Sequence, residues 1–128
     1  MRYLLDTNII IDHLKEREII NEDILLSGAG ISIISLGELI FGAHKSNNPQ
    51  KSLNQVEISL KILKLEVVNL NGEVVSEFGK IKADLEIKGE RLEDFDLLIA
   101  ATALVNGFTL VTKNLKHFKR IKDLKLKD

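Results

Sequence analysis

The stretch YLLDTNIIID, residues 3–12, places a carboxylate directly after a short apolar run. Residues 2–6 are predicted to form a strand. Asn8 is suited to cap a helix that continues to about residue 15, because its amide oxygen can accept a bond from a free backbone N–H. Continuously apolar strands are usually buried in a parallel sheet, and ligands bind beyond the carboxyl ends of such strands. Asp6 is therefore a candidate site residue.

Three further polar residues lie next to apolar runs in a similar way. Glu38 comes shortly after the uncharged run ISIISL, Asp96 directly precedes LLIAA, and Asn114 follows TLVT. Since the carboxyl ends of parallel strands share one edge of a sheet, these side chains are expected to meet there. Carboxylates at close range repel one another, so an oxygen-rich pocket of this kind indicates a hard divalent cation.

The order of the expected elements predicts one domain over residues 1–128, a three-layer α/β/α sandwich with a central, mainly parallel sheet. Gly28 and Gly30 are expected to mark a turn, and Ser35 is expected to cap the helix that carries Glu38. The expected strands are 2–6, 31–35, 66–70 and 108–112, with a short final strand over 121–126. The expected helices are 8–15, 21–26, 36–44, 49–63, 72–88, 94–105 and 114–118.

Composition adds constraints on the class of protein. The net charge of −1 favours no particular partner, yet residues 113–128 carry seven Lys or Arg against two Asp and could face a phosphate backbone. Without Cys there is no disulfide or thiolate chemistry, and a reducing cytoplasm fits. The early charges suit no signal peptide, and no apolar run approaches the roughly 18 residues of a membrane span.

Each acidic candidate has a structural alternative. Asp6 is either a helix cap or a metal ligand, and capping by Asn8 would leave it free for metal. Glu38 lies among Leu and Ile side chains, where an unpaired carboxylate is costly, or else it faces solvent on its helix. Asp94 and Asp96 compete for the cap of their helix, and the preferred division is a capping Asp94 and a metal-binding Asp96.

The polar candidates are more open. Asn114 is a metal or substrate ligand, or it caps the short helix that follows. Thr112 is suited to bond a phosphate or a carboxylate of the site. Arg91 is a phosphate contact at the pocket mouth or a surface residue. No zinc, phosphate-loop, dinucleotide or nucleophile-elbow motif is present.

The ordered set of LLDTNIIID, ISLGEL, DLLIAA and VTKN resembles the PIN-domain ribonucleases, most closely the VapC toxins of toxin–antitoxin pairs. The resemblance covers essentially the whole chain. It implies an endoribonuclease that depends on Mg²⁺ or Mn²⁺ and cuts single-stranded regions of structured RNA. By motif position it assigns the acidic triad to Asp6, Glu38 and Asp96, with Asn114 where many relatives carry a fourth acid.

The resemblance also implies a homodimer and a small antitoxin protein that blocks the site. The sequence favours pairing as well, because the helices near residues 34–41 and 49–63 carry more apolar residues than one sheet face can cover. Two alternatives stay open: a PIN-like module that binds RNA or protein with little catalysis, and a metal-dependent phosphatase. The phosphatase motif Asp-x-Asp occurs only at Asp94 and Asp96, without a clear strand ahead of it.

Overall fold

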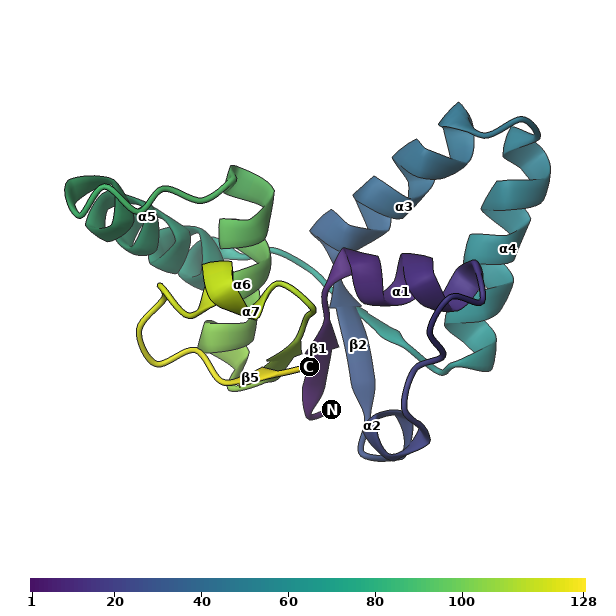
Figure 1. Cartoon of the computed structure of the whole chain (residues 1–128), viewed down its shortest axis with the longest axis horizontal. Coiled ribbons are helices and arrows are strands. Elements are labelled where there is room, and N and C mark those ends of the chain that lie inside the picture. Colours follow the sequence, from purple (N-terminus) through teal and green to yellow (C-terminus); the bar gives the residue numbers. More distant parts are fainter.

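The structure, a computed structural model, describes residues 1–128 as a five-stranded sheet between two layers of helices (Figure 1). All four strand pairings are parallel, in the order β3-β2-β1-β4-β5. The strands are β1 Tyr3–Leu5, β2 Ala29–Ser32, β3 Glu66–Val68, β4 Thr109–Val111 and β5 Leu126–Lys127. The helices are α1 Thr7–Leu14, α2 Glu22–Leu26, α3 Ile33–Lys45, α4 Pro49–Ile62, α5 Gly72–Ile87, α6 Asp94–Asn106 and α7 Leu115–Phe118. The expected α/β/α architecture is confirmed.

Alternating side chains of the central strands build a separate core on each face of the sheet. Leu4 and Leu110 belong to one hydrophobic cluster, whereas Leu5 and Val111 belong to the other. This follows from the two-residue period of a strand, which sends successive side chains to opposite faces. The first cluster packs under α5, α6 and α7, on the left of Figure 1, and the second under α1, α3 and α4, on the right.

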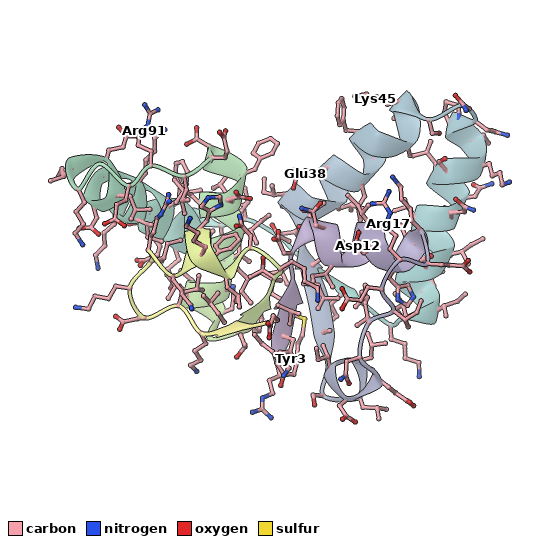
Figure 2. All side chains as sticks on the ribbon, viewed as in Figure 1. Tyr3, Asp12, Arg17, Glu38, Lys45 and Arg91 are labelled. Atoms are coloured by element: carbon pink, nitrogen blue, oxygen red, sulfur yellow. The ribbon has the colours of Figure 1, made fainter.

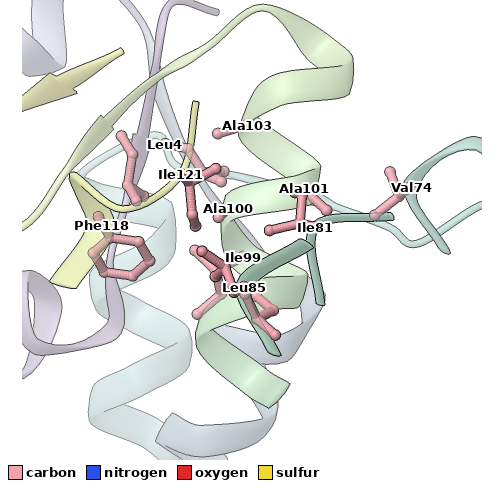
Figure 3. Packing of buried hydrophobic residues seen from close by; sticks show 12 residues of the cluster. Leu4, Val74, Ile81, Leu85, Ile99, Ala100, Ala101, Ala103, Phe118 and Ile121 are labelled. Carbon is pink, nitrogen blue, oxygen red and sulfur yellow. The ribbon is translucent and has the colours of Figure 1, made fainter. Parts of the chain in front are cut away.

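Helix α6 is the most deeply buried helix. Three of its alanines are fully buried, and Phe118 and Leu4 lie in the same cluster (Figure 3). Small side chains let the helix backbone approach the sheet and α5 closely. The N-terminal end of α6, which carries Asp96, is thereby held against the carboxyl edge of the sheet.

The start of α3 differs from the expectation. The strand expected over residues 31–35 is β2, which ends at Ser32, and α3 begins at Ile33 rather than Leu36. Ser32, not Ser35, is the N-cap: its hydroxyl accepts the N–H of Ile34 at 3.0 Å. Local capping and packing thus prevail over the β-propensity of two consecutive isoleucines.

Gly30 is part of β2 and not of a turn. A Cβ on this residue would lie 2.6 Å from the carbonyl oxygen of Glu66, so only glycine permits this approach of β2 to β3. Gly28, with φ of +91°, makes the turn alone. The last strand is also displaced, because β5 covers Leu126–Lys127 and the residues from Ile121 form turns. No helix has both the length and the apolar character needed to cross a membrane.

Candidate active site

The parallel sheet brings the predicted site residues to one cleft. Asp6 directly follows β1, Glu38 lies on the helix that leaves β2, and Asn114 comes shortly after β4. Asp96, in the first turn of α6, faces them from the other helical layer. All four line a cleft of 790 Å³, here called the apolar cleft. Its remaining lining residues are Thr7, Asn8, Ile11, Ile33, Ile34, Gly37, Phe41, Gly42 and Phe95.

Asp6 is buried, and both of its carboxylate oxygens are occupied by protein donors. The backbone N–H of Thr7 donates to Oδ1 at 2.9 Å, which makes Asp6 itself the N-cap of α1. The hydroxyl of Thr112 donates to Oδ2 at 2.8 Å, across 106 residues of sequence. Each carboxylate oxygen has a second lone pair, so Asp6 remains able to bind a cation.

The expectation that Asn8 would cap α1 is therefore wrong. The helix begins at Thr7, directly after the extended backbone of Asp6, and Asn8 is an exposed residue within its first turn. Asp6 both caps α1 and lines the cleft. The two readings of Asp6 are thus not exclusive, because one oxygen caps while the carboxylate as a whole still borders the cleft.

Glu38 is half-buried and is held by a hydroxyl pair. The Oγ1 of Thr7 donates to Glu38 Oε1 at 2.6 Å, and the Oγ of Ser35 lies 2.9 Å from the same Oγ1. Since Thr7 has a single hydroxyl proton, Ser35 must donate to Thr7 for both contacts to be satisfied. This short relay ties α3 to the start of α1 and fixes the carboxylate toward the cleft.

The other wall of the cleft carries no such supports. No protein hydrogen bond contributes to the environment of Asp96, and the side chain of Asn114 makes no capping bond although the residue occupies the N-cap position of α7. The backbone of Asn114 is engaged on both sides: its N–H donates to the hydroxyl of Thr112 at 3.0 Å, and its carbonyl oxygen accepts from the N–H of Phe118 at 3.3 Å. The side-chain amide of Asn114 is free to bind a ligand.

Burial and mutual repulsion disturb the titration of these acids. Burial, followed by the negative charges of Asp6, Glu38 and Glu93, raises the pKa of Asp96 to about 6. Burial also raises the pKa of Asp6, although the hydrogen bonds from Thr112 and Thr7 partly offset it. No Lys or Arg forms an ion pair with Asp6, Glu38 or Asp96. The site therefore concentrates uncompensated negative charge.

The donor set fits a divalent cation. It consists of carboxylate and amide oxygens only, which are the ligands that hard ions such as Mg²⁺ and Mn²⁺ prefer. In this structure the acids share a cleft but do not converge on one position, since no three His, Asp or Glu side chains form a group that could hold an ion. An ion at this place would relieve the repulsion that raises the pKa of Asp96.

A second cleft adjoins the apolar cleft at Glu38 and Asp96. It has a volume of 910 Å³ and shares Glu38, Phe95, Asp96 and Asn114 with the apolar cleft. Its other lining residues are Lys82, Arg91, Leu92, Glu93, Asp94, His117 and Arg120. It is called the cationic cleft after Lys82, Arg91 and Arg120, although Glu38, Glu93, Asp94 and Asp96 line it as well. Figure 2 places Arg91 and Glu38 on the two sides of the molecule that border this region. Glu38 and Asp96 thus lie where the two clefts meet, whereas Asp6 lines the apolar cleft alone.

Asp94 has a role other than the expected cap. Glu93 occupies the N-cap position of α6, without a side-chain capping bond, and Asp94 is the first helical residue. Its carboxylate accepts an ion pair from Lys82 at 2.9 Å, which links α6 to α5. The Asp-x-Asp spacing of Asp94 and Asp96 also follows a loop and not a strand, so the phosphatase arrangement is absent.

The remaining candidates are placed as follows. Thr112 is fully buried and bonds a site carboxylate, one of the two roles expected for it. Arg91 is exposed and lines the cationic cleft. Asp12 lies outside both clefts and pairs with Arg17 at 3.6 Å. Of the basic C-terminal residues, Arg120 lines the cationic cleft, whereas Lys113 points elsewhere and bonds Glu18 at 2.8 Å.

Several residues of the site were not assigned from the sequence. Thr7 had no expected role, although a hydroxyl next to a buried acid is a signal that could have suggested one. Phe95 was also missed as a lining residue, and its signal was its position directly before Asp96. Arg120 belongs to the basic segment 113–128 that the sequence suggested as a phosphate contact, but only the fold shows that it lies beside residue 91.

Comparison with known proteins agrees with this geometry. The chain matches the PIN domain family over residues 3–124. It is 36% identical to Ribonuclease VapC1 of Methanocaldococcus jannaschii, over 98% of this chain and 85% of that protein. It is 35% identical to the tRNA(fMet)-specific endonuclease VapC of Salmonella typhimurium, over 100% of this chain and 98% of that protein.

A solved structure extends the likeness to three dimensions. The crystal structure of VapBC2 from Rickettsia felis, bound to a DNA fragment from its promoter, contains a chain that matches with a TM-score of 0.90 and 34% identity. The match covers 99% of this chain and 98% of that chain. The fold, the cleft with its three acids and the sequence similarity over nearly the whole chain lead to one assignment. The chain belongs to the PIN domain family, among the VapC ribonucleases.

Proposed function

We propose that this protein is an endoribonuclease that uses Mg²⁺, with Mn²⁺ as a substitute, and acts as the toxin of a toxin–antitoxin pair. The observation that carries the proposal is the meeting of Asp6, Glu38 and Asp96 in one cleft without a cationic partner. Three uncompensated carboxylates at the carboxyl edge of a parallel sheet repel one another unless a divalent cation neutralises them.

Within this proposal the residues divide the work. Asp6, Glu38 and Asp96 would hold the cation, with Asn114 as a weaker oxygen ligand or a contact to substrate. A divalent ion bound there would lower the pKa of water and neutralise charge on phosphate oxygens. Thr112 and Thr7 orient Asp6 and Glu38 through hydrogen bonds of 2.8 and 2.6 Å. Hydrolysis by in-line attack of water leaves a 5′-phosphate and a 3′-hydroxyl.

The substrate and partners follow from the relatives. The name of the Salmonella relative specifies a transfer RNA, so single-stranded regions of structured RNA are the first substrates to test. Such substrates are met in the cytoplasm. The Rickettsia felis structure is of a VapBC pair, and we propose that a small antitoxin likewise covers the cleft of this chain.

A homodimer is also part of the proposal. Ile40 and Phe41 on α3 are 38% and 64% exposed, and Ile58 and Ile62 on α4 are 54% and 73% exposed. Apolar patches of this kind usually mark interfaces, and two-fold pairing is the commonest closed arrangement. Sedimentation at micromolar concentration should give about twice the 14.4 kDa of one chain, and a clean monomer would refute the pairing.

The activity is tested with a 5′-labelled initiator tRNA and, in parallel, a chromogenic phosphomonoester. We expect cleavage of the RNA with Mg²⁺ or Mn²⁺, none with a chelator, and products whose 3′ ends can be extended enzymatically. Asp96→Asn protein purified in the same way controls for contaminating nucleases. Hydrolysis of the phosphomonoester without RNA cleavage would replace the proposal by a phosphatase, and RNA binding without cleavage would replace it by a binding module.

The toxin role has its own test. Induced expression of the chain alone should arrest growth, and coexpression with the product of a small adjacent upstream reading frame should restore growth and yield a stable complex. Asp96→Asn should not arrest growth. Arrest by the Asp96→Asn protein would separate toxicity from nuclease chemistry.

A further inference from the structure

The ring of Phe95 is an exposed aromatic surface beside the acids. It is 54% exposed, although it is the residue directly before Asp96, and it lines both the apolar and the cationic cleft. Two positions further along α6, Leu97 is only 1% exposed, so the helix buries its other apolar side chains normally. Phe95 therefore presents its ring to the cleft and contributes little to the core.

No cation of the protein lies over this ring. The cation–π contacts of the structure involve Tyr3, Phe41 and Phe78, and none involves Phe95. Phe41, which is 64% exposed, has the ammonium of Lys45 5.3 Å from its ring centroid and lines the apolar cleft but not the cationic cleft. Phe95 is thus the exposed phenyl ring that lines the cationic cleft.

The cations of the same cleft point to the chemistry of that ligand. Lys82 is neutralised by Asp94 at 2.9 Å, but Arg91 and Arg120 form no ion pair. The Nη1 of Arg120 donates to the carbonyl oxygen of Arg91 at 3.2 Å, which holds the loop before α6 against the segment after α7. Two arginines without carboxylate partners, at the end of a cleft that also contains Asp96, are suited to phosphate groups.

We infer that the cationic cleft is a subsite for single-stranded RNA, in which Phe95 stacks on an unpaired nucleobase next to the scissile phosphate and Arg91 and Arg120 contact backbone phosphates. This assignment rests on the proposed nuclease function. Phe95 and Asp96 line the same two clefts, so a base on the ring would lie in the cleft that holds the group bound by Asp96. A base can lie flat on the ring only when it is unpaired and unstacked, so the ring selects single strands.

A fluorescence experiment tests the stacking directly. The chain contains no Trp, so Phe95→Trp introduces a single reporter. In an Asp6→Asn background that cannot cleave, a single-stranded oligoribonucleotide should quench this reporter, and a blunt duplex of the same sequence should not. Ile87→Trp, at an 86% exposed position near the end of α5, is the matched control and should not respond to either. Equal quenching of both reporters, or quenching by the duplex alone, would overturn the subsite.

Kinetics test the contribution to cleavage. Phe95→Leu keeps an apolar residue but removes the ring, and we expect kcat/KM on single-stranded RNA to fall by about tenfold, with Phe95→Tyr close to the parent. In the double variant Arg91→Gln/Arg120→Gln, the negative slope of log affinity against log salt should become shallower by about 1.4, because two phosphate contacts are lost. Lys51→Gln on α4 should leave the slope unchanged.

The outcomes separate this inference from the proposed function. If the parent cleaves RNA with metal and Phe95→Leu is equally active, the subsite is wrong and the nuclease stands. If the parent does not cleave RNA at all, the nuclease itself fails. If Phe95→Leu cleaves normally but binds a protein inhibitor more weakly, the ring is a protein contact and the RNA subsite is refuted.

Discussion

The apolar cleft, which contains the three acids, has two walls that are built differently. On the wall formed by β1 and α3, the hydroxyl of Thr112 donates to Asp6 and the hydroxyl of Thr7 donates to Glu38. On the wall formed by α6, Asp96 has no protein hydrogen bond and its pKa is raised to about 6. One wall is therefore preorganised by folding, whereas the other keeps its carboxylate free until a ligand arrives.

This difference affects how readily the side chains of each wall can move. Buried hydrogen-bond networks resist displacement, because a broken bond leaves an unsatisfied polar group away from water. A side chain without such partners can move toward an ion at little cost.

The largest effect is expected from Asp96→Asn. We expect RNA cleavage to fall by roughly three orders of magnitude, equivalent to about 4 kcal/mol in the barrier, because a charged oxygen ligand is lost. Without metal the variant should be more stable by about 1 kcal/mol, since repulsion is relieved. Activity assays and urea unfolding of the same preparation measure both.

Asp6→Asn is the matched variant on the other wall. It should lose activity to a similar extent but gain less stability, because the Thr112 hydroxyl then loses its carboxylate acceptor. Equal stabilisation by the two substitutions would show that the hydroxyl supports are unimportant. Full activity of Asp6→Asn at saturating Mg²⁺ would reduce Asp6 to a helix cap.

The second prediction concerns the hydroxyl supports themselves. Thr112→Val removes the donor to Asp6 and the acceptor for Asn114, so we expect a loss of about 1–2 kcal/mol in stability. Activity should fall by about 10–100-fold, mainly through weaker metal binding. Titration with Mg²⁺ should recover part of that loss, whereas a decrease that no metal concentration alleviates would exclude a positioning role.

A third prediction follows from titration of the metal-free protein. The pKa of Asp96 in the folded chain, about 6, lies above the ordinary value of 3.8, so the folded state binds this proton more tightly than the unfolded state. Stability from this source is fully present below about pH 4 and is lost as pH rises to about 6. We expect a decrease of about 1 kcal/mol, discounted for the solvent exposure of the group.

Chemical denaturation between pH 4 and 7 in the presence of a chelator checks this prediction. Asp6 should add to the same trend, because burial raises its pKa as well. The Asp96→Asn variant should show a flatter profile over the same range. Stability of the parent that instead rises steadily from pH 4 to 6 would contradict the raised pKa of these acids.

The smallest effect is expected from Asp94→Asn, the neighbour that differs from Asp96 in having a partner. Its ion pair with Lys82 joins two partly exposed side chains, so its loss should cost less than about 0.5 kcal/mol. Cleavage should change by less than about twofold. A large loss of activity would place Asp94 in the site. It would contradict the division of roles in which Asp94 pairs with Lys82 and Asp96 stays free for a ligand.

The sequence predicted the architecture because the signals for it are local. Short apolar runs typical of strands alternate in the sequence with segments whose apolar residues have helical spacing. This order favours helices on both faces of a parallel sheet. The family prediction is confirmed by the match over residues 3–124. Element boundaries were less accurate: the two isoleucines after Ser32 have strand propensity but lie in α3, since capping and packing decided between the two states.

The candidate site divides in the same way. The sequence by itself determined which residues carry negative charge next to apolar runs, because a carboxylate there stands out against its neighbours. Only the tertiary structure decided which of them are held and which are free. Thr112 reaches Asp6 across 106 residues, and Arg120 reaches the loop of Arg91 across 29. Contacts of that range depend on how strands pair and helices pack, and no local pattern encodes them.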